Sequence, residues 1–257
     1  MKKQIIASIL LALAMQSPAN ATHYIDLSHD YSDKTPAWPT AKHFKEIKIS
    51  KETPQGAYVA GGDIEMNEHD GTHLDAPNHF SKGHKSVEQI DLSDLIGPAV
   101  NIDVRDIVKA DPDHQINIQD IKHWETVNGK IPPDSIVLLN TGYGSYWDNY
   151  RRYTGMTPTA KDSAENFHFP GLDPQAAEWL ISQRKVKAIG IDTFSIDYGQ
   201  TQNYATHQIL TKNDIPIFEN ISSMTKLPPR HFKIYAFPMK IKGGTGAPLR
   251  IVAEVYQ

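Results

Sequence analysis

The sequence predicts a single α/β domain built around a predominantly β core. Most of its apolar segments are short and have the patterns of strands, and they outnumber the segments with helical spacing. In the second half of the chain, expected helices alternate with expected strands, which indicates a mixed α/β arrangement. The 257 residues are 39% hydrophobic, and because no low-complexity linker divides them we expect one domain with a sizeable core.

The expected strands show period-two alternation or run continuously apolar. They are predicted at 24–28, 44–50, 58–66, 99–104, 135–142, 186–191, 215–218, 234–241 and 249–255. The segments 44–50 and 58–66 alternate apolar and polar residues, as half-buried strands do. Segment 135–142 is apolar throughout and ends sharply, which is typical of a central strand buried on both sides.

Three segments have helical spacing, at 118–127, 173–183 and 205–210. The second has the clearest start, because Asp173 is a favourable N-cap residue and Pro174 suits the first helical position. A turn with a short helical piece is expected at 91–96. It should end at Gly97-Pro98, since neither residue favours a helix interior.

Two irregular segments have composition-based interpretations. Segment 143–166 is rich in Tyr and Trp, and it is interpreted either as a helix and loop near a functional pocket or as a surface excursion packed on its own rings. Loop 243–246 is Gly-Gly-Thr-Gly, but it lacks the spacing and the following helix of a phosphate-binding loop. We therefore expect it to connect two strands of a hairpin.

The first 21 residues are expected to be a secretory signal peptide, so that the mature domain is 22–257. Two lysines precede an apolar run at 5–15, and Ala19-Asn20-Ala21 supplies the small residues that a signal peptidase requires. The run is too short to span a bilayer. A buried N-terminal helix is the alternative, and export predicts a periplasmic protein.

Charge and cysteine content exclude several classes of function. Cleavage would remove two lysines and no acid, which changes the net charge from −4 to −6. An acidic surface without basic clusters argues against a nucleic-acid partner. No other stretch is apolar enough to predict a membrane span. The chain has no cysteine, so any metal must bind nitrogen and oxygen ligands.

One short segment gathers most of the chemically active side chains. Within eleven positions lie His69, His73, Asp75 and His79. All four have the same parity, so an extended backbone would direct them to one face, whereas a helix would spread them over about 160°. Gly71 and Pro77 also disfavour a helix, and we expect them to bend a strand and loop together. The ligand types suit zinc, manganese or iron; the alternative is a polar surface loop.

The segment from His69 to His79 resembles the His-x-Gly-Thr-His-x-Asp-x-Pro-x-His signature of the cyclase-like metal-dependent hydrolases. That family includes bacterial kynurenine formamidases and isatin hydrolases. Every fixed position of the signature is present, and the resemblance continues at 36–39, 169–172 and 190–197. It implies a swivelling β/β/α fold and hydrolysis of amide C–N bonds in a small aromatic substrate. It also implies one or two zinc or manganese ions as cofactor, and a homo-oligomer, either dimer or tetramer.

The resemblance also implies roles for individual residues. The implied metal ligands are His69, His73, Asp75, His207 and Glu219. Asp75 would bridge where two metals bind, His79 would be the general acid and base, and Trp38 would form an aromatic wall for a planar substrate. Isatin hydrolases are described as having one metal with a Gln ligand in the later helix, so Gln208 is an alternative ligand to its neighbour His207.

Other interpretations of these residues remain open from sequence alone. His207 could be an ordinary helix-terminal histidine, Glu219 a solvated charge and Trp38 a core residue. Asp192 and Asp197 are interpreted as buried carboxylates that cap turns. Thr193 and Ser195 have no adjacent base and are not interpreted as nucleophiles. Asn220-Ile221-Ser222 matches a glycosylation acceptor, but the signal peptide has a bacterial character.

The predicted function is therefore that of a metal-dependent amidohydrolase, arylformamidase-like and akin to the kynurenine formamidases of tryptophan catabolism. An isatin hydrolase-like cyclic amide hydrolase, or a related lactone hydrolase, is the enzymatic alternative. A periplasmic metal-binding protein is the non-enzymatic one, and it would require neither a spare His79 nor an aromatic wall.

Overall fold

The computed structural model describes residues 22–157, 161 and 163–256. The expected signal peptide at 1–21 lies outside the described residues. None of the helices in the described part of the chain is both long and apolar enough to cross a membrane.

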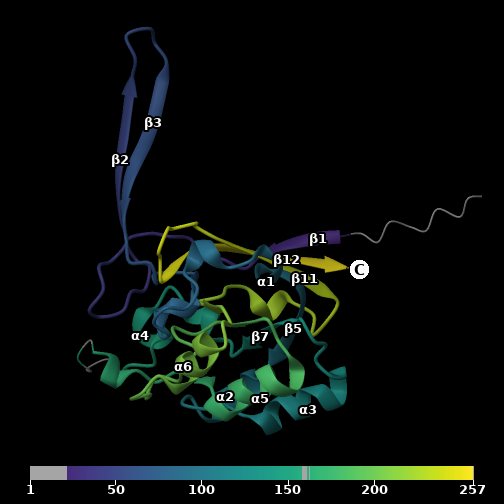
Figure 1. The fold of residues 1–257 in the computed structure, drawn as a ribbon. Coiled ribbons are helices and arrows are strands. Elements are labelled where there is room, and N and C mark those ends of the chain that lie inside the picture. Colours follow the sequence, from purple (N-terminus) through teal and green to yellow (C-terminus); the bar gives the residue numbers. More distant parts are fainter. Residues whose placement is uncertain (1–21, 158–160, 162, 257) are drawn as a thin grey trace, which may run out of the picture.

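A closed, mixed β-barrel forms the centre of the molecule (Figure 1). Its seven strands, in spatial order, are β12 Gly246–Tyr256, β11 Phe232–Pro238, β5 Ile96–Asp103, β7 Ile136–Asn140, β9 Ala188–Ile191, β10 Ile217–Glu219 and β4 His73–Asp75. Pairing of β4 with β12 closes the ring, and β1 Thr22–Asp26 adds to the outer edge of β12. Strands β5, β7, β9 and β10 are parallel, and the other pairings are antiparallel.

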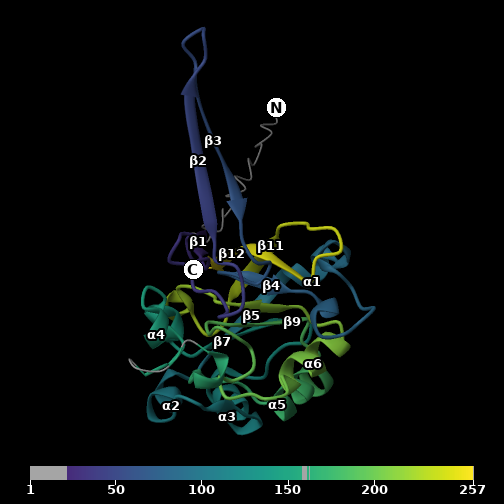
Figure 2. The same cartoon turned by 90° about the vertical axis from the view of Figure 1, so that its left-hand side faces the viewer.

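Most of the helices cover one side of the parallel strands, as both views show (Figure 2). These are α2 Arg105–Ala110, α3 Ile118–Asn128, α4 Tyr150–Tyr153, α5 Pro174–Trp179 and α6 Ala205–Lys212. The short α1 Leu92–Leu95 lies apart from them, beside β5 and β11. The side chain of Asp173 caps α5 by accepting hydrogen bonds from two backbone amides, and Pro174 occupies its first position, as predicted. A π-helical turn, Leu180–Arg184, continues α5. Strands β6 Gln115–Ile116 and β8 Gly171–Leu172 form a separate small pair.

The hydrophobic core has two parts, separated by the parallel strands. In β7, Ile136 and Leu138 face the barrel interior, whereas Val137 and Leu139 face the helices. Both faces are covered, which explains why the four residues that precede Asn140 in this strand are all apolar. The prediction of one α/β domain with a mainly β core, and of the swivelling β/β/α arrangement implied by the resemblance, is confirmed.

A long hairpin projects from the body, and here the sequence prediction was partly wrong. Strands β2 Lys45–Glu52 and β3 Tyr58–Glu65 pair with each other over their whole length, but every residue in them is exposed. The alternation at 44–50 and 58–66 predicts half-buried strands, yet no described part of the chain covers either face. We call residues 45–65 the arm (Figures 1 and 2).

Two further details differ from expectation. Gly97-Pro98 does not precede a strand but lies within β5, opposite Lys233 and Ile234 of β11. The described residues of segment 143–166 include short helical turns, and Tyr153 is fully buried among the core residues. Its rings therefore pack on the core of the domain and not only on one another, which contradicts the surface excursion.

Candidate metal centre and active site

The four residues of the His-rich segment come from three different local structures. His69 lies in a turn, His73 and Asp75 lie in β4, and His79 ends the 3-10 turn Pro77–His79. The strand of the expected strand and loop is three residues long. Gly71, with φ of +64°, makes the turn before β4, and Pro77 begins the helical turn after it, so both bend the chain as predicted.

Strand register brings Glu219 to this segment. In the antiparallel pair of β4 and β10, Glu219 is the direct partner of His73. Directly opposed residues in such a pair project to the same face, so their side chains meet. His73 Nε2 lies 3.5 Å from Glu219 Oε2. The two residues are 146 positions apart, and the barrel topology alone makes them neighbours.

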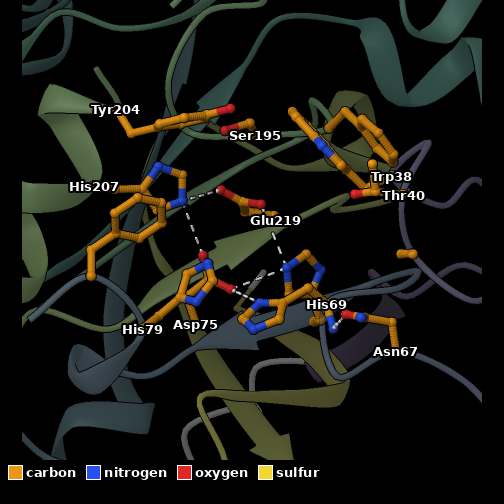
Figure 3. Close-up of a pocket in the computed structure, with 14 residues that line it drawn as sticks. Trp38, Thr40, Asn67, His69, Asp75, His79, Ser195, Tyr204, His207 and Glu219 are labelled. Atoms are coloured by element: carbon orange, nitrogen blue, oxygen red, sulfur yellow. Dashed lines mark hydrogen bonds and ion pairs between the residues drawn. The ribbon is translucent and has the colours of Figure 1, made fainter. Parts of the chain in front are cut away.

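The buried carboxylate of Asp75 joins the two halves of the cluster. Its Oδ1 lies 2.6 Å from His69 Nδ1 and 3.2 Å from His73 Nε2. Its Oδ2 lies 3.1 Å from His207 Nε2 on α6. Figure 3 shows the side chains of Asp75, His69 and His207 pointing toward one another.

Backbone and carboxylate partners fix the orientation of two histidines. His73 Nδ1 donates to the carbonyl of Gly71 at 2.9 Å, and His207 Nδ1 donates to Asp197 Oδ2 at 2.6 Å. When either ring is neutral, its Nε2 atom therefore carries the lone pair and faces the centre of the cluster. Asp197 also accepts hydrogen bonds from the backbone amides of Thr206 and His207. The same carboxylate therefore caps α6 and orients the His207 ring.

Contacts within the cluster shift the pKa values of its own side chains away from their usual ranges. Burial alone would lower the pKa of His73, but the hydrogen bond to Asp75 and the charges of Asp75 and Glu219 raise it to about 9. Burial alone would raise the pKa of the Asp75 carboxyl, but the neighbouring histidines hold it well below its usual range. Side chains that stabilise one another's charged forms at this depth are typical of a functional site.

The donor set fits a divalent metal ion. Two groups of donor atoms each lie within 4.8 Å of one another: the first is His69, His73 and Asp75, and the second is Asp75, His79 and His207. Ligand atoms that bind one ion at about 2.1 Å in octahedral geometry lie about 3.0 Å apart. The distances from Asp75 to His73 and His207 match this spacing. Asp75 belongs to both groups, so the cluster has room for one or two ions.

His79 differs from the other histidines of the cluster. Its ring stacks on His69 with centroids 3.9 Å apart, and within the described chain its side chain makes ring contacts and no hydrogen bond. Burial lowers the pKa of His79 to about 4, against the opposing charge of Asp75. The imidazole is therefore neutral at pH 7, and its ring nitrogens have no hydrogen-bond partner within the described chain.

A cavity of about 340 Å³ opens over the cluster, and Trp38 forms part of its wall. The Trp38 ring is stacked on Phe194, with centroids 5.5 Å apart, and meets the edge of Phe167. Tyr153 of the 143–166 segment packs against Phe194 from behind. The predicted aromatic wall is therefore present, and the segment supports it from outside the cavity.

Sequence reasoning missed several residues that shape the site. Glu68 Oε2 accepts hydrogen bonds from the backbone and the hydroxyl of Thr245, and Thr245 Oγ1 lies 3.1 Å from His69 Nε2. A side chain at Gly246 would collide with the His69 ring. The Gly-rich loop is thus the predicted hairpin connection and also a support for His69. A hairpin loop carries no sequence signal for that second role.

The structure also separates alternatives that the sequence left open. Gln208 is exposed and donates to the carbonyl of Asn203, so it faces away from the cluster, whereas His207 faces into it. Asp192 is buried and accepts the backbone amides of Thr141 and Gly142, which is the turn-capping role predicted for it. Asn220 is fully buried, which excludes it as a glycosylation acceptor.

Comparisons with known proteins agree with this geometry. Residues 25–198 match the family model described as putative cyclase. An isatin hydrolase from Roseibium aggregatum is 30% identical over 91% of this chain and 87% of its own. A kynurenine formamidase from Bacillus cereus is 27% identical over 90% of this chain and 97% of its own. The structure of isatin hydrolase A from Ralstonia solanacearum superposes with a TM-score of 0.82 at 29% identity, covering 91% of this chain and 92% of that one.

The fold and the buried His/Asp/Glu cluster define the class as a hydrolase with a site able to hold metal. The chain belongs to the cyclase family.

Replacing Asp75 tests the cluster directly. We expect Asp75→Ala to be purified without stoichiometric divalent metal, because both halves of the cluster lose the carboxylate that they share. Elemental analysis beside the wild type provides the measurement. Asp63→Ala, an exposed aspartate in the arm, serves as the control and should keep its metal. Normal metal content in Asp75→Ala would remove Asp75 from the ligand set.

We expect Asp197 to affect the affinity for the metal through its hydrogen bond to His207. Asp197 accepts the Thr206 amide on Oδ1 and both the His207 amide and the His207 ring on Oδ2. Asparagine has one accepting oxygen and no charge, so it cannot keep all three hydrogen bonds, and we expect Asp197→Asn to weaken metal affinity by about 10- to 100-fold. Competition with a chromophoric chelator measures the affinity. Asp173→Asn, which alters the comparable cap of α5 far from the cluster, is the matched control. Equal affinities in the two variants would show that Asp197 acts only as a helix cap.

Proposed function

We propose that this protein hydrolyses an amide C–N bond in a small aromatic substrate, using a divalent metal held by His69, His73, Asp75, His207 and Glu219. One observation carries the proposal. The cluster places several donors around one point, beside a neutral imidazole without a hydrogen bond and beneath an aromatic wall. The isatin hydrolase and kynurenine formamidase relatives carry names that fit this chemistry.

Each group in the site would have a separate role in hydrolysis. A divalent ion, when bound, polarises the substrate carbonyl and lowers the pKa of a water molecule. His79 would take a proton from the attacking water on its free ring nitrogen and return that proton to the departing amide nitrogen. Trp38 and Phe194 would hold a flat substrate by stacking and exclude bulk water from the reacting bond.

The charge of the cavity distinguishes the two candidate substrates. Among the described residues that line it, none is Lys or Arg. N-formylkynurenine carries an amino-acid carboxylate, whose burial without a cation is costly. Isatin is a neutral, planar cyclic amide and requires no such partner. The cavity therefore favours the cyclic amide over the formamide of an amino acid.

A metal-binding protein without catalysis is the rival from another class. It would use the same ligands, but it would gain nothing from the lone His79 or from the stacked Trp38. The nitrogen and oxygen donors suit zinc or manganese equally. We further propose that the chain acts in the periplasm, on the basis of its first 21 residues.

His79 is the residue that separates catalysis from binding. We expect His79→Ala to retain its metal and to lower kcat by about 100-fold or more, because general acid–base catalysis contributes on that scale. His84→Ala, which removes a half-buried histidine that is paired with Asp214 and does not line the cavity, should leave kcat unchanged. Full activity in His79→Ala would exclude the mechanism, and loss of metal would reassign His79 as a ligand.

Substrate preference tests the charge argument. We expect kcat/KM for isatin to exceed that for N-formylkynurenine by about 10-fold or more, since each unpaired buried charge costs at least 1.4 kcal/mol. In Thr40→Arg, a cation at the exposed rim of the cavity should move the preference toward N-formylkynurenine, while Thr40→Gln should not. A wild-type enzyme that prefers N-formylkynurenine would contradict the assignment.

A further inference from the structure

His69 faces the cluster with a different ring nitrogen from its neighbours. Its Nδ1 atom lies 2.6 Å from Asp75 Oδ1, whereas His73 and His207 direct Nε2 toward the same carboxylate, at 3.2 Å and 3.1 Å. In His73 and His207 the other nitrogen, Nδ1, donates to a carbonyl or a carboxylate that fixes the ring. For His69, the corresponding partner must be found at Nε2.

Thr245 supplies that partner from the loop between β11 and β12. Its hydroxyl oxygen lies 3.1 Å from His69 Nε2 and 2.8 Å from Glu68 Oε2. An ionised carboxylate can only accept a hydrogen bond, so the single hydroxyl proton of Thr245 goes to Glu68. The hydroxyl oxygen then offers only lone pairs to His69, and the nitrogen that meets them must carry a proton. These contacts place a proton on Nε2 and leave Nδ1 as the nitrogen that can bind a metal.

Backbone hydrogen bonds fix the loop that carries Thr245. The Thr245 carbonyl accepts from the amide of Ala76 at 2.9 Å, and the carbonyl of Gly244 accepts from the amide of Val87 at 3.1 Å. Both donors lie in the segment that follows β4, so the loop is tied to the part of the chain that carries the cluster. The Thr245 hydroxyl is therefore held in place relative to the His69 ring.

Gly246 leaves room for the ring edge that carries Nδ1. It is the register partner of Asp75 in the pairing of β12 with β4. A Cβ atom at Gly246 would lie 2.5 Å from His69 Cε1, well below the separation of about 3.5–4.0 Å at which carbon atoms pack. Any larger residue would push the ring away from Asp75. Two successive residues of the loop thus act on the same imidazole, one through its hydroxyl and one through its missing side chain.

We propose that Glu68 and Thr245 are positioning residues of the metal centre, which hold a proton on His69 Nε2 and so present His69 Nδ1 to the ion. Neither residue is among those that line the cavity, so both act on the reaction only through His69. Hydrogen bonds of this kind set the tautomer and the orientation of metal-binding histidines. The inference rests on the proposed metal site, but not on the identity of the substrate.

Zinc affinity separates the effect of the hydroxyl from that of side-chain shape. Thr245→Val keeps the branched shape and removes the hydroxyl, so we expect it to raise the Kd for zinc by about 10- to 100-fold, measured by competition with a chromophoric chelator. Thr245→Ser keeps the hydroxyl and should bind zinc as the wild type does. Thr126→Val, which removes an exposed hydroxyl from α3, is the matched control and should also bind normally. Circular dichroism verifies that each variant is folded.

A double-mutant cycle tests whether Glu68 acts through Thr245. Glu68→Ala removes the acceptor and frees the hydroxyl proton to turn toward Nε2, so we expect this variant to lose zinc affinity as well. In the Glu68→Ala background the further change Thr245→Val should have little effect, because the hydroxyl no longer has a fixed direction. Losses that multiply in the double variant would show that the two residues act separately and would overturn the proposed link.

Nitrogen-15 NMR of histidine-labelled protein observes the ring proton directly. Zinc has a filled d shell, so the zinc-loaded protein is diamagnetic and suited to this measurement. We expect the His69 ring of the wild type to carry its proton on Nε2 and to bind zinc through Nδ1. A proton on Nδ1, with zinc on Nε2, would overturn the assignment.

Failure of this inference can be told apart from failure of the proposed function. A wild type that binds no zinc would contradict both. A wild type that binds zinc, with an unchanged Kd in Thr245→Val, would overturn only the role of Thr245. A loss of affinity in Thr245→Val that Thr245→Ser does not restore would assign the effect to packing and not to the hydroxyl, which also contradicts the inference.

Discussion

The site depends on the two-sided contact of one buried carboxylate. Asp75 Oδ1 faces the histidines of its own segment, and Oδ2 faces His207 on α6. The contact requires β4 to lie between β10 and β12, where its register sets Glu219 opposite His73. It also requires α6 to start where Asp197 can cap it and hold the His207 ring. The strand pairings that close the barrel therefore also bring the residues of the candidate metal centre together.

The parts of the site that the sequence predicted are those encoded locally. The spacing from His69 to His79, with Gly71 and Pro77, predicts a bent cluster because short-range geometry decides it. The meeting of His73 with Glu219 depends on strand register 146 residues apart, and only the resemblance pointed to it. Asp197 was predicted as a turn cap, but its role in orienting His207 requires the helix to be in place.

The exposed arm shows which part of the fold could not be predicted from the sequence. Alternation at 44–50 and 58–66 correctly predicts two strands with one face suited to burial, but it carries no information on what covers that face. No residue in the described part of the chain covers that face, which is why the half-buried prediction was wrong. The 143–166 segment is the opposite case: its aromatic composition left open a place near a pocket or on the surface, and in the structure its Tyr153 packs on Phe194, a residue of the cavity wall.

The most direct test of the account is crystallographic. Crystals of residues 22–257 grown with manganese or zinc would be measured at the absorption edge of the metal, and the anomalous difference map would locate the ion. The account predicts a peak within about 2.0–2.3 Å of Asp75 and of His73 Nε2, which is the range for such ligands. A map with no peak at Asp75, or with the metal held elsewhere, would contradict the central claim.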